Sequence, residues 1–503
     1  MVEYSNIRII GAGAMGRGIA QSAVAAGFPV QLCDAVPEAV PAALEFVARM
    51  LRRTAEKGLR TSAEAEAAIA RLSVGPEPHA ASTEVDLVIE AVREDLAIKQ
   101  ALFAQLDAAL PNATLASNTS SLSITAIAAV VADPSRVLGL HFFNPVPLMR
   151  LVEIVPGMRT DPSRIDAGMG FVRALGHTPV LAKDNPGFLV NLLGRGLPTE
   201  ALSIHTEDIA NVADLDRIAR DTIGLKMGPF ELMDLTGLDI SHPVLESVWR
   251  GFYCDERLRP SLSTGIRTTA GLLGRKSGEG FYTYVDGAQQ VAPEPQLEQD
   301  ATAIAIHVVG GGPLTELLVN ASIRVVGSPG PGVISVVQPL GRPAYLAAIE
   351  HGLDASRTIG VDPLSVETKR LTVIAPVPVD VELGRAAIRA LAATGKAITV
   401  TADGPAPVAQ RIIASMVNVA SSAAQDGLGT PADIDLGAEL GLGYPQGPLS
   451  LGDTLGPSTI LAILDGLLDY TGDSRYRASG WLRTRADLGL SLLYAGTRPA
   501  ALT

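Results

Sequence analysis

Three glycines near the start of the chain, Gly11, Gly13 and Gly16, have the spacing GxGxxG. They follow an apolar run at residues 7–10 and open a segment rich in helix formers. The first glycine permits a tight turn, the second lets the backbone approach a pyrophosphate, and the third allows close packing of helix on strand. Asp34 follows the next predicted strand, where a carboxylate can bond ribose hydroxyls and repel a 2′-phosphate. The pattern predicts an NAD site; the alternative is a glycine-rich turn with a surface aspartate.

Four polar residues farther along the chain carry side chains suited to oxidising a secondary alcohol. A base must accept the hydroxyl proton as the hydride leaves carbon, and the imidazole of His141 can do so near neutral pH. Glu153 can accept a hydrogen bond from the other ring nitrogen, which would fix the tautomer and stabilise the imidazolium. Ser120 and Asn191 carry neutral donors for the reacting oxygen.

Each of these four side chains also has a purely structural interpretation. His141 can be a satisfied histidine at a strand end, and Glu153 a solvated charge at another. Ser120 and Asn191 can cap helices, as short polar residues commonly do. The catalytic interpretation depends on all four occurring together.

The segments around these residues alternate between short apolar runs and helix-forming stretches. That alternation predicts a doubly wound, mostly parallel sheet with crossover helices, a Rossmann domain at residues 1–187. The predicted strands cover residues 7–10, 30–33, 87–89, 114–116, 137–141, 151–155 and 178–182. Ligands bind such sheets at the carboxyl ends of the strands, which is where His141 is expected.

A repeated pattern divides the rest of the chain. Gly-Pro-x-x-Leu-x-Asp-x-x-Gly ends both the stretch Leu215–Gly237 and the stretch Ile434–Gly456. The repeat predicts a duplicated helical module. We expect an all-α domain at residues 188–286, a linker with a reduced α/β domain at 287–404, and a second helical copy at 405–503. The strands expected in the reduced domain are residues 304–309, 371–375 and 397–400, with a helix at 343–351.

The longest motifs resemble the 3-hydroxyacyl-CoA dehydrogenase family. They are ASNTSSLSIT from Ala116, HFFNPVP from His141, DNPGFLVN from Asp184, GPFELMD from Gly228 and GRKSGEGFY from Gly274, and the resemblance covers residues 7–284. It implies NAD-dependent oxidation of an (S)-3-hydroxyacyl-CoA to the 3-ketoacyl-CoA. It also implies that Ser120, His141, Glu153 and Asn191 are the four catalytic positions.

The same resemblance implies further contacts with the cofactor and the substrate. Around NAD it adds Glu94, Lys99, Ser120, Asn144 and Lys276 to Asp34 and the glycines, and around the acyl-CoA it implies Ser120, Asn191 and, for the CoA moiety, Lys57. Glu94 and Lys99 can instead be an exposed helix pair, and Lys57 a solvated lysine. Met50 and Leu192 depart from the serine and arginine common in relatives.

The length and the duplication are similar to a long bacterial form of the family, associated with phenylacetate catabolism and 3-hydroxyadipyl-CoA. A short-chain 3-hydroxybutyryl-CoA dehydrogenase is the alternative. A retained NAD-binding fold in a structural, crystallin-like protein is an alternative of another class. A 3-hydroxyacid dehydrogenase without CoA would place a lysine in the region of Asn191.

The second half lacks an equivalent catalytic set. Gln410 stands where Asn191 stands in the first half, and no GxGxxG or HFFNP segment precedes it. Gly310–Gly312 lacks the full spacing and is interpreted as a structural turn. Relatives with one helical domain dimerise through it, so the copy is expected to take the place of a dimer partner. A homo-oligomer is also possible.

Composition excludes several other classes. The chain of 503 residues has a net charge of −13, which argues against general affinity for nucleic acid. It has no uninterrupted apolar run of roughly 18 residues and no signal-peptide pattern, so we expect no membrane span and a cytoplasmic location. Cys33 and Cys254 are expected to be packed small residues, without a disulfide framework or a metal site.

Overall fold

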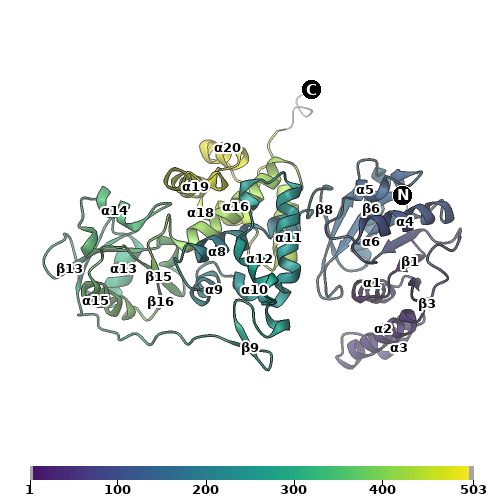
Figure 1. The fold of residues 1–503 in the computed structure, drawn as a ribbon, viewed down its shortest axis with the longest axis horizontal. Helices are drawn as coiled ribbons and strands as arrows, with labels where there is room; N and C mark the ends of the chain where they lie inside the picture. Colours follow the sequence, from purple (N-terminus) through teal and green to yellow (C-terminus); the bar gives the residue numbers. More distant parts are fainter. Residues whose placement is uncertain (1–3, 498–503) are drawn as a thin grey trace. The chain divides into compact units, whose positions relative to one another are not determined.

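The computed structural model describes residues 4–497, and the chain divides into two compact units. The first unit contains the chain up to Leu192 together with Asp426–Leu442. The second contains Leu193–Gln425 and the chain from Gly443 onward. Figure 1 shows their helices and strands. A short piece of the second helical copy therefore belongs to the unit that carries the N-terminal sheet.

The first unit is built on a sheet with the order β3-β2-β1-β4-β5-β6-β7-β8. Neighbouring strands are parallel apart from the antiparallel pair β6 and β7. The strands are β1 Ile7–Ile10, β2 Val30–Cys33, β3 Leu72–Val74, β4 Leu87–Glu90, β5 Thr114–Ser117, β6 Val137–Phe142, β7 Leu151–Pro156 and β8 Thr178–Leu181. The helices are α1 Ala14–Ala25, α2 Ala39–Glu56, α3 Ser62–Ile69, α4 Leu96–Ala109, α5 Ile124–Ala128, η1 Pro134–Arg136, α6 Pro162–Ala174 and α17 Pro431–Leu442, with α7 Val190–Leu193 at the boundary.

The predicted doubly wound sheet is confirmed, because the apolar runs form its buried strands. Helix α2 shows how a helix covers it: Val40, Ala43, Val47 and Leu51 form a buried stripe at helical spacing. The sequence missed β3, whose residues are half-buried or exposed and therefore show no apolar pattern.

The second unit contains two helical modules and a smaller sheet. The first module and its hairpin are α8 Gly196–Thr206, α9 Val212–Asp221, α10 Pro229–Thr236, α11 Leu238–Gly251, η2 Glu256–Leu258, α12 Leu262–Thr269, η3 Arg275–Ser277, β9 Thr283–Val285 and β10 Ala288–Gln290. The α/β part is β11 Ala305–Val308, α13 Pro313–Asn320, β12 Val325–Val326, β13 Val333–Val337, α14 Ala344–Glu350, η4 Ala355–Arg357, β14 Thr358–Val361, η5 Pro363–Ser365, β15 Arg370–Ala375, α15 Val381–Ala392 and β16 Ala397–Ala402. The second module has α16 Val408–Gln425, α18 Pro448–Leu455, α19 Pro457–Thr471, η6 Ser474–Tyr476 and α20 Gly480–Leu488.

The aspartate of the repeated Asp-x-x-Gly motif accepts equivalent backbone hydrogen bonds in the two modules. Asp234 on α10 accepts hydrogen bonds from the backbone N–H groups of Phe281 and Tyr282, both at 2.9 Å. Asp453 on α18 accepts from the N–H of Leu492 at 2.7 Å. Each aspartate thus fastens the last segment of its module onto the helix that follows the Gly-Pro pair.

The smaller sheet reproduces part of the larger one, since β11, β13, β14, β15 and β16 follow one another as β4, β5, β6, β7 and β8 do. Its order is β12-β11-β13-β14-β15-β16, and β14 and β15 are antiparallel as β6 and β7 are. Strands β11, β15 and β16 were predicted, whereas β12, β13 and β14 were missed. The GxGxxG loop of the first sheet follows β1, whereas Gly310–Gly312 follow β11, which corresponds to β4. These glycines are therefore not at the position of a GxGxxG loop. The unit of strand, glycine loop and helix that opens the first sheet has no counterpart here within residues 4–497.

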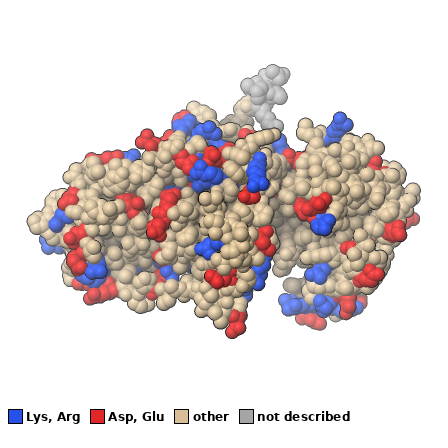
Figure 2. Space-filling view, viewed as in Figure 1, with Lys and Arg blue, Asp and Glu red and all other residues tan. Residues whose placement is uncertain are grey.

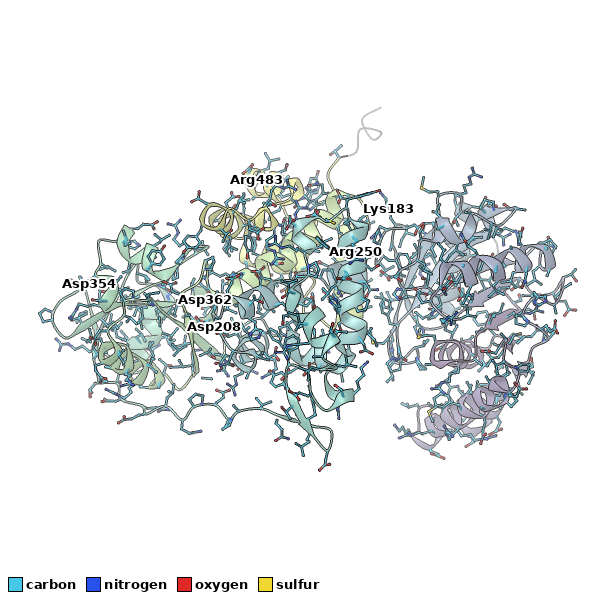
Figure 3. The ribbon with its side chains drawn as sticks, in the orientation of Figure 1. Lys183, Asp208, Arg250, Asp354, Asp362 and Arg483 are labelled. Atoms are coloured by element: carbon cyan, nitrogen blue, oxygen red, sulfur yellow. The ribbon has the colours of Figure 1, made fainter. Side chains whose placement is uncertain are left out.

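The residue of the second sheet at the position of His141 is Asp362, which follows β14 (Figure 3). Its backbone N–H donates to the carbonyl of Thr372 at 3.0 Å, so these residues face each other as His141 and Glu153 do. Gln410 donates to the Asp362 carboxylate at 2.9 Å. Asp362 is fully buried, and within residues 4–497 its Oδ2 and the Thr372 hydroxyl have no hydrogen-bond partner.

The two helical modules pack on each other through α8 and α16. An ideal Cβ on Gly196 would lie 2.8 Å from the Cα of Met416, so the two backbones are in direct contact. Nearby, the buried guanidinium of Arg411 lies 2.7 Å from Glu200 and 2.6 Å from Glu207. A buried ion pair of this kind needs every partner in place.

Charged side chains are interspersed on the visible face of Figure 2, where blue and red groups alternate among uncharged ones. Among residues 4–497, no single helix is long and apolar enough to cross a membrane, although the bent pair α18 and α19 together has the length and composition. The same part of the chain holds no cluster of His, Cys, Asp or Glu suited to a metal ion. Cys33 is buried as predicted, but Cys254 is exposed in the turn after α11, so its predicted packing is wrong.

Replacing Arg411 with methionine will lower the free energy of unfolding by about 3–5 kcal/mol, because Glu200, 1% exposed, loses its cation at 2.7 Å and is left with the more distant Arg475 at 3.7 Å. The control is Arg483→Met, which breaks an exposed pair with Asp465 (Figure 3) and should cost no more than about 1 kcal/mol. Chemical denaturation measures both, and equal effects would contradict the interpretation of the buried pair.

Asp362→Asn will stabilise the protein more at pH 7.5 than at pH 4.5. Burial raises the pKa of Asp362 to about 6, against a lowering by the hydrogen bond from Gln410. The folded state therefore holds a proton that the unfolded chain has already lost, and stability falls as the pH rises from the ordinary value near 4 to about 6. Asparagine removes this loss, a gain of roughly 1–3 kcal/mol above pH 7.

The control for this change is Asp354→Asn, at the start of η4 before the same strand. A hydrogen bond from the Ser356 hydroxyl holds the pKa of Asp354 below its ordinary value. Its replacement should destabilise, and the loss should shrink as the pH falls. Urea denaturation at both pH values tests the pair, and the prediction for Asp362 fails if its effect does not change with pH.

Candidate active site

The glycine loop after β1 has the geometry that a dinucleotide requires. Gly11 has φ of 111°, and an ideal Cβ there would lie 2.4 Å from the carbonyl oxygen of Ala91. A Cβ on Gly16 would lie 1.7 Å from the carbonyl oxygen of Gly11, so α1 approaches the turn closely. Gly13 has nothing within 4 Å of such a Cβ and has no side-chain cap at the start of α1. Its open side leaves the first N–H groups of the helix available to phosphates.

Asp34 lies at the end of β2 beside this loop. Its carboxylate accepts hydrogen bonds from the N–H of Ala12 at 2.7 Å and of Val36 at 2.9 Å. A cavity of about 610 Å³ adjoins it, lined also by Val40, Val74, Pro78 and His79. A mostly apolar pocket lined by the Asp34 carboxylate, with Glu77 also in its wall, suits an adenosine whose ribose is held by its hydroxyls. The open glycine, the helix start and this pocket fit the pyrophosphate and adenosine of NAD.

Glu94 and Lys99 form an ion pair, but only Glu94 is exposed, so the exposed helix pair considered above is wrong for Lys99. Glu94 accepts from the Thr119 hydroxyl at 2.5 Å and from the N–H of Ser120 at 3.0 Å. Lys99 is 1% exposed and lies 2.6 Å from the buried Glu90 and 3.3 Å from Glu94. Burial alone would raise the pKa of Glu94, but the Thr119 hydrogen bond and the Lys99 charge hold it below its ordinary value. Glu94 is therefore an ionised anchor for the loop that carries Ser120.

His141 and Glu153 form the polar centre of the unit. They are directly opposite each other in the antiparallel pair of β6 and β7, and His141 Nδ1 lies 2.5 Å from Glu153 Oε2. Glu153 is fully buried, and its Oε1 accepts from the N–H groups of Leu189 at 2.9 Å and Val190 at 2.8 Å. Because a carboxylate only accepts, the imidazole proton belongs on Nδ1. Within residues 4–497 no group hydrogen-bonds Nε2, which presents a lone pair.

The other two candidate catalytic residues come together at the same edge of the sheet. Ser120 follows β5 and His141 ends β6, and these strands are parallel neighbours, so both lie at carboxyl ends. The Asn191 side chain donates to the backbone carbonyl of Ser120 at 3.2 Å. The ring of His141 packs against that of Phe143, with centroids 4.3 Å apart.

Among residues 4–497, three further predicted contacts make no hydrogen bond to His141, Glu153, Ser120 or Asn191. Asn144 is exposed just after β6, and Lys57 is exposed at the end of α2. Lys276 belongs to the second unit, where its Nζ lies 2.6 Å from Asp239. Leu192, which replaces an arginine of relatives, is buried.

Two supporting residues were missed as functional from the sequence. Asp184 accepts from the N–H groups of Ile124 and Thr125, at 2.9 and 2.8 Å, and so holds the start of α5 after the Ser120 loop. Asn118 accepts from the N–H of Phe142 at 2.8 Å and ties the ends of β5 and β6 together. Asp184 opens the motif DNPGFLVN, a position that could have drawn attention to it. Nothing in the sequence indicated a role for Asn118 apart from its place in the motif ASNTSSLSIT.

Comparison with known proteins identifies the family. Residues 6–185 match the family described as "3-hydroxyacyl-CoA dehydrogenase, NAD binding domain". Residues 187–284 and again 408–492 match "3-hydroxyacyl-CoA dehydrogenase, C-terminal domain", so the duplication is confirmed. NAD is the cofactor of this family.

Relatives of both lengths are similar to the chain. The 3-hydroxyadipyl-CoA dehydrogenase of Escherichia coli (strain K12) is 34% identical over 97% of this chain and 98% of its own. The probable 3-hydroxybutyryl-CoA dehydrogenase of Bacillus subtilis (strain 168) is 41% identical over 56% of this chain and 98% of its own. A crystal structure described as 3-hydroxybutyryl-CoA dehydrogenase from E. coli K12 has 34% identity and a TM-score of 0.87, covering 97% of this chain and 99% of that one. The chain belongs to the 3-hydroxyacyl-CoA dehydrogenase family and is an NAD-dependent dehydrogenase.

Proposed function

We propose that the chain oxidises (S)-3-hydroxyacyl-CoA thioesters to 3-ketoacyl-CoA, with His141 as the general base. The observation that carries this is the buried His141–Glu153 pair at 2.5 Å, with the other carboxylate oxygen held by two backbone N–H groups. A histidine held in this way has one nitrogen committed to its carboxylate and the other free for a substrate proton.

The proton of the substrate hydroxyl passes to Nε2 of His141 as the C–H bond of the carbon that bears this hydroxyl breaks. The imidazolium that results is stabilised by the Glu153 carboxylate at Nδ1. NAD⁺ bound at the glycine loop supplies the acceptor for the hydride. The charges balance, since the alcohol loses one hydride and one proton and becomes a ketone.

Ser120 and Asn191 would hold the reacting oxygen as it becomes a carbonyl. Both side chains donate without a charge, so they favour the developing oxygen dipole without competing for its proton. The Asn191 side chain donates a hydrogen bond to the Ser120 carbonyl, and the Glu94 carboxylate accepts one from the Ser120 N–H. In the same proposal Lys57 contacts the CoA moiety, and Asn144 and Lys276 contact the cofactor.

For the substrate we propose 3-hydroxyadipyl-CoA, an intermediate of phenylacetate catabolism. The support is the 34% identity to the E. coli 3-hydroxyadipyl-CoA dehydrogenase, which extends over 98% of that relative and includes the second half. The alternative is 3-hydroxybutyryl-CoA, the substrate in the names of the B. subtilis relative and of the E. coli crystal structure.

We also propose one active site per chain, with the second helical module in the place of a dimer partner. The contact between α8 and α16 and the buried Arg411 support this. In the second sheet Asp362 and Thr372 stand at the positions of His141 and Glu153, so the histidine–carboxylate pair of the first sheet has no counterpart at these positions. A purely structural NAD-binding protein is disfavoured by the intact His141–Glu153 pair.

His141→Gln will lower kcat by about 10²–10⁴, the usual scale for loss of a general base. Glu153→Gln should lower kcat by a similar factor, because an amide N–H facing Nδ1 would move the imidazole proton to Nε2 and remove the base. The Kd for NADH should stay within about twofold in both variants, since neither residue belongs to the glycine loop. Acetoacetyl-CoA reduction and NADH fluorescence give these values, and near-normal turnover of His141→Gln would refute its role.

A substrate panel will separate the two candidate substrates. We expect kcat/KM for 3-hydroxyadipyl-CoA to exceed that for 3-hydroxyhexanoyl-CoA by about tenfold or more, because a matched group for the distal carboxylate contributes at least ~1.4 kcal/mol. The two acyl chains have the same length and differ only in that carboxylate. A higher kcat/KM for 3-hydroxybutyryl-CoA than for both would favour the alternative.

A further inference from the structure

Helix α17 belongs to the second helical module by sequence but packs on the catalytic sheet. The chain leaves the second unit after Gln425 and returns to it after Leu442. On the way, the backbone N–H of Lys183, which follows β8 (Figure 3), donates to the carbonyl of Leu428 at 2.9 Å. The Lys183 ammonium donates to the carbonyl of Asp426 at 3.2 Å. The segment that leads into α17 is thereby fastened to the edge of the first sheet.

The packed face of α17 includes two glycines one turn apart, Gly437 and Gly441, where the helix backbone comes close to its neighbours. An ideal Cβ on Gly437 would lie 3.6 Å from the side chains of Leu189 and Val190, an ordinary contact. An ideal Cβ on Gly441 would lie 2.8 Å from Val190 Cγ1 and 3.0 Å from Leu151. Gly441 therefore leaves no room for a methyl group, whereas Gly437 does.

The residues that α17 touches are the ones that hold Glu153. The N–H groups of Leu189 and Val190 are the donors to Glu153 Oε1. Leu151 lies two residues before Glu153 on β7. The side chains of Leu189 and Val190 are 0% and 1% exposed, so a displacement of either is carried into the backbone.

We infer that α17 of the non-catalytic module positions the Glu153–His141 pair, and that Gly441 is the positioning residue. This inference rests on the proposed function, because it assigns α17 a role only if His141 and Glu153 act as described. The second module then contributes to catalysis without touching the substrate, the cofactor or the reacting atoms.

The internal repeat provides a comparison. In the second unit the N–H of Ala402 donates to the carbonyl of Ile209 at 2.9 Å, the counterpart of the bond from Lys183 to Leu428. A Cβ on Gly404 would lie 2.4 Å from Ile209 Cδ1, so that contact is close too. The segment before α9 thus contacts the last strand of the second sheet, and the segment before α17 contacts Lys183, just after the last strand of the first sheet. Of these two sheets, the first carries the pair of His141 and Glu153.

The test compares Gly441→Ala with Gly437→Ala in the full chain. Both changes add one methyl group to the same helix and raise its helix propensity equally. Val190 is β-branched and stiff, so the methyl at Gly441 displaces its backbone and with it a donor to Glu153. We expect kcat of Gly441→Ala to fall about 10- to 100-fold, with KM for acyl-CoA and Kd for NADH within about twofold. Gly437→Ala should keep wild-type kcat within about twofold.

Two further variants make the test decisive. Val190→Ala in the Gly441→Ala chain removes the obstructing methyl groups and should restore most of kcat, which a loss of general stability would not allow. Val190→Ile adds bulk to the same contact from the α7 side and should lower kcat even if Gly441→Ala does not fold. Equal kcat for Gly441→Ala and Gly437→Ala, or no rescue by Val190→Ala, would overturn the inference.

His141→Gln measured in parallel separates this inference from the proposed function. If His141→Gln loses turnover and Gly441→Ala does not, the positioning role of α17 is wrong and the assignment of the base stands. If His141→Gln keeps turnover, the assignment of the base is wrong and the inference falls with it.

Discussion

The buried carboxylate of Glu153 is the interaction on which the catalytic unit depends. A charge with no exposed surface is tolerated only when every oxygen has a partner. One oxygen meets the histidine across the β6–β7 pair, and the other meets the N–H groups of Leu189 and Val190 at the start of α7. The antiparallel turn-back of β7 in an otherwise parallel sheet is what brings glutamate and histidine face to face.

The same constraint explains how a duplicated chain can carry unequal halves. The second sheet keeps the antiparallel pair and the aspartate that holds the first turn of its helix, since Asp403 accepts from the N–H groups of Ala344 and Tyr345 as Asp184 does from Ile124 and Thr125. It has lost the glycine-loop unit and the histidine. The fold of the second sheet is retained because its strands and helices must still pack, whereas the proposed catalysis requires Ser120, His141, Glu153 and Asn191 together.

Local patterns in the sequence were sufficient to predict the glycine loop, Asp34 and the buried strands of the first sheet, because turn geometry and burial leave contiguous signals, whereas the exposed edge strand β3 was missed. The family resemblance added the four catalytic positions. Long-range contacts left no such signal: Lys99 resembles an exposed helix charge but lies on the buried Glu90. Strands β13 and β14 were missed even though their residues are mostly apolar and buried. The exchange of α17 between modules is a property of chain topology, so no periodicity within residues 431–442 could reveal it.

The central claim is that one chain holds one catalytic site, completed by a second half that has none of its own. Fluorescence titration of the full chain with NADH, at a protein concentration well above Kd, counts the sites directly. We expect a break at one NADH bound per chain. A break at two per chain would show that the second α/β domain also binds the cofactor and would contradict the division of labour between the halves.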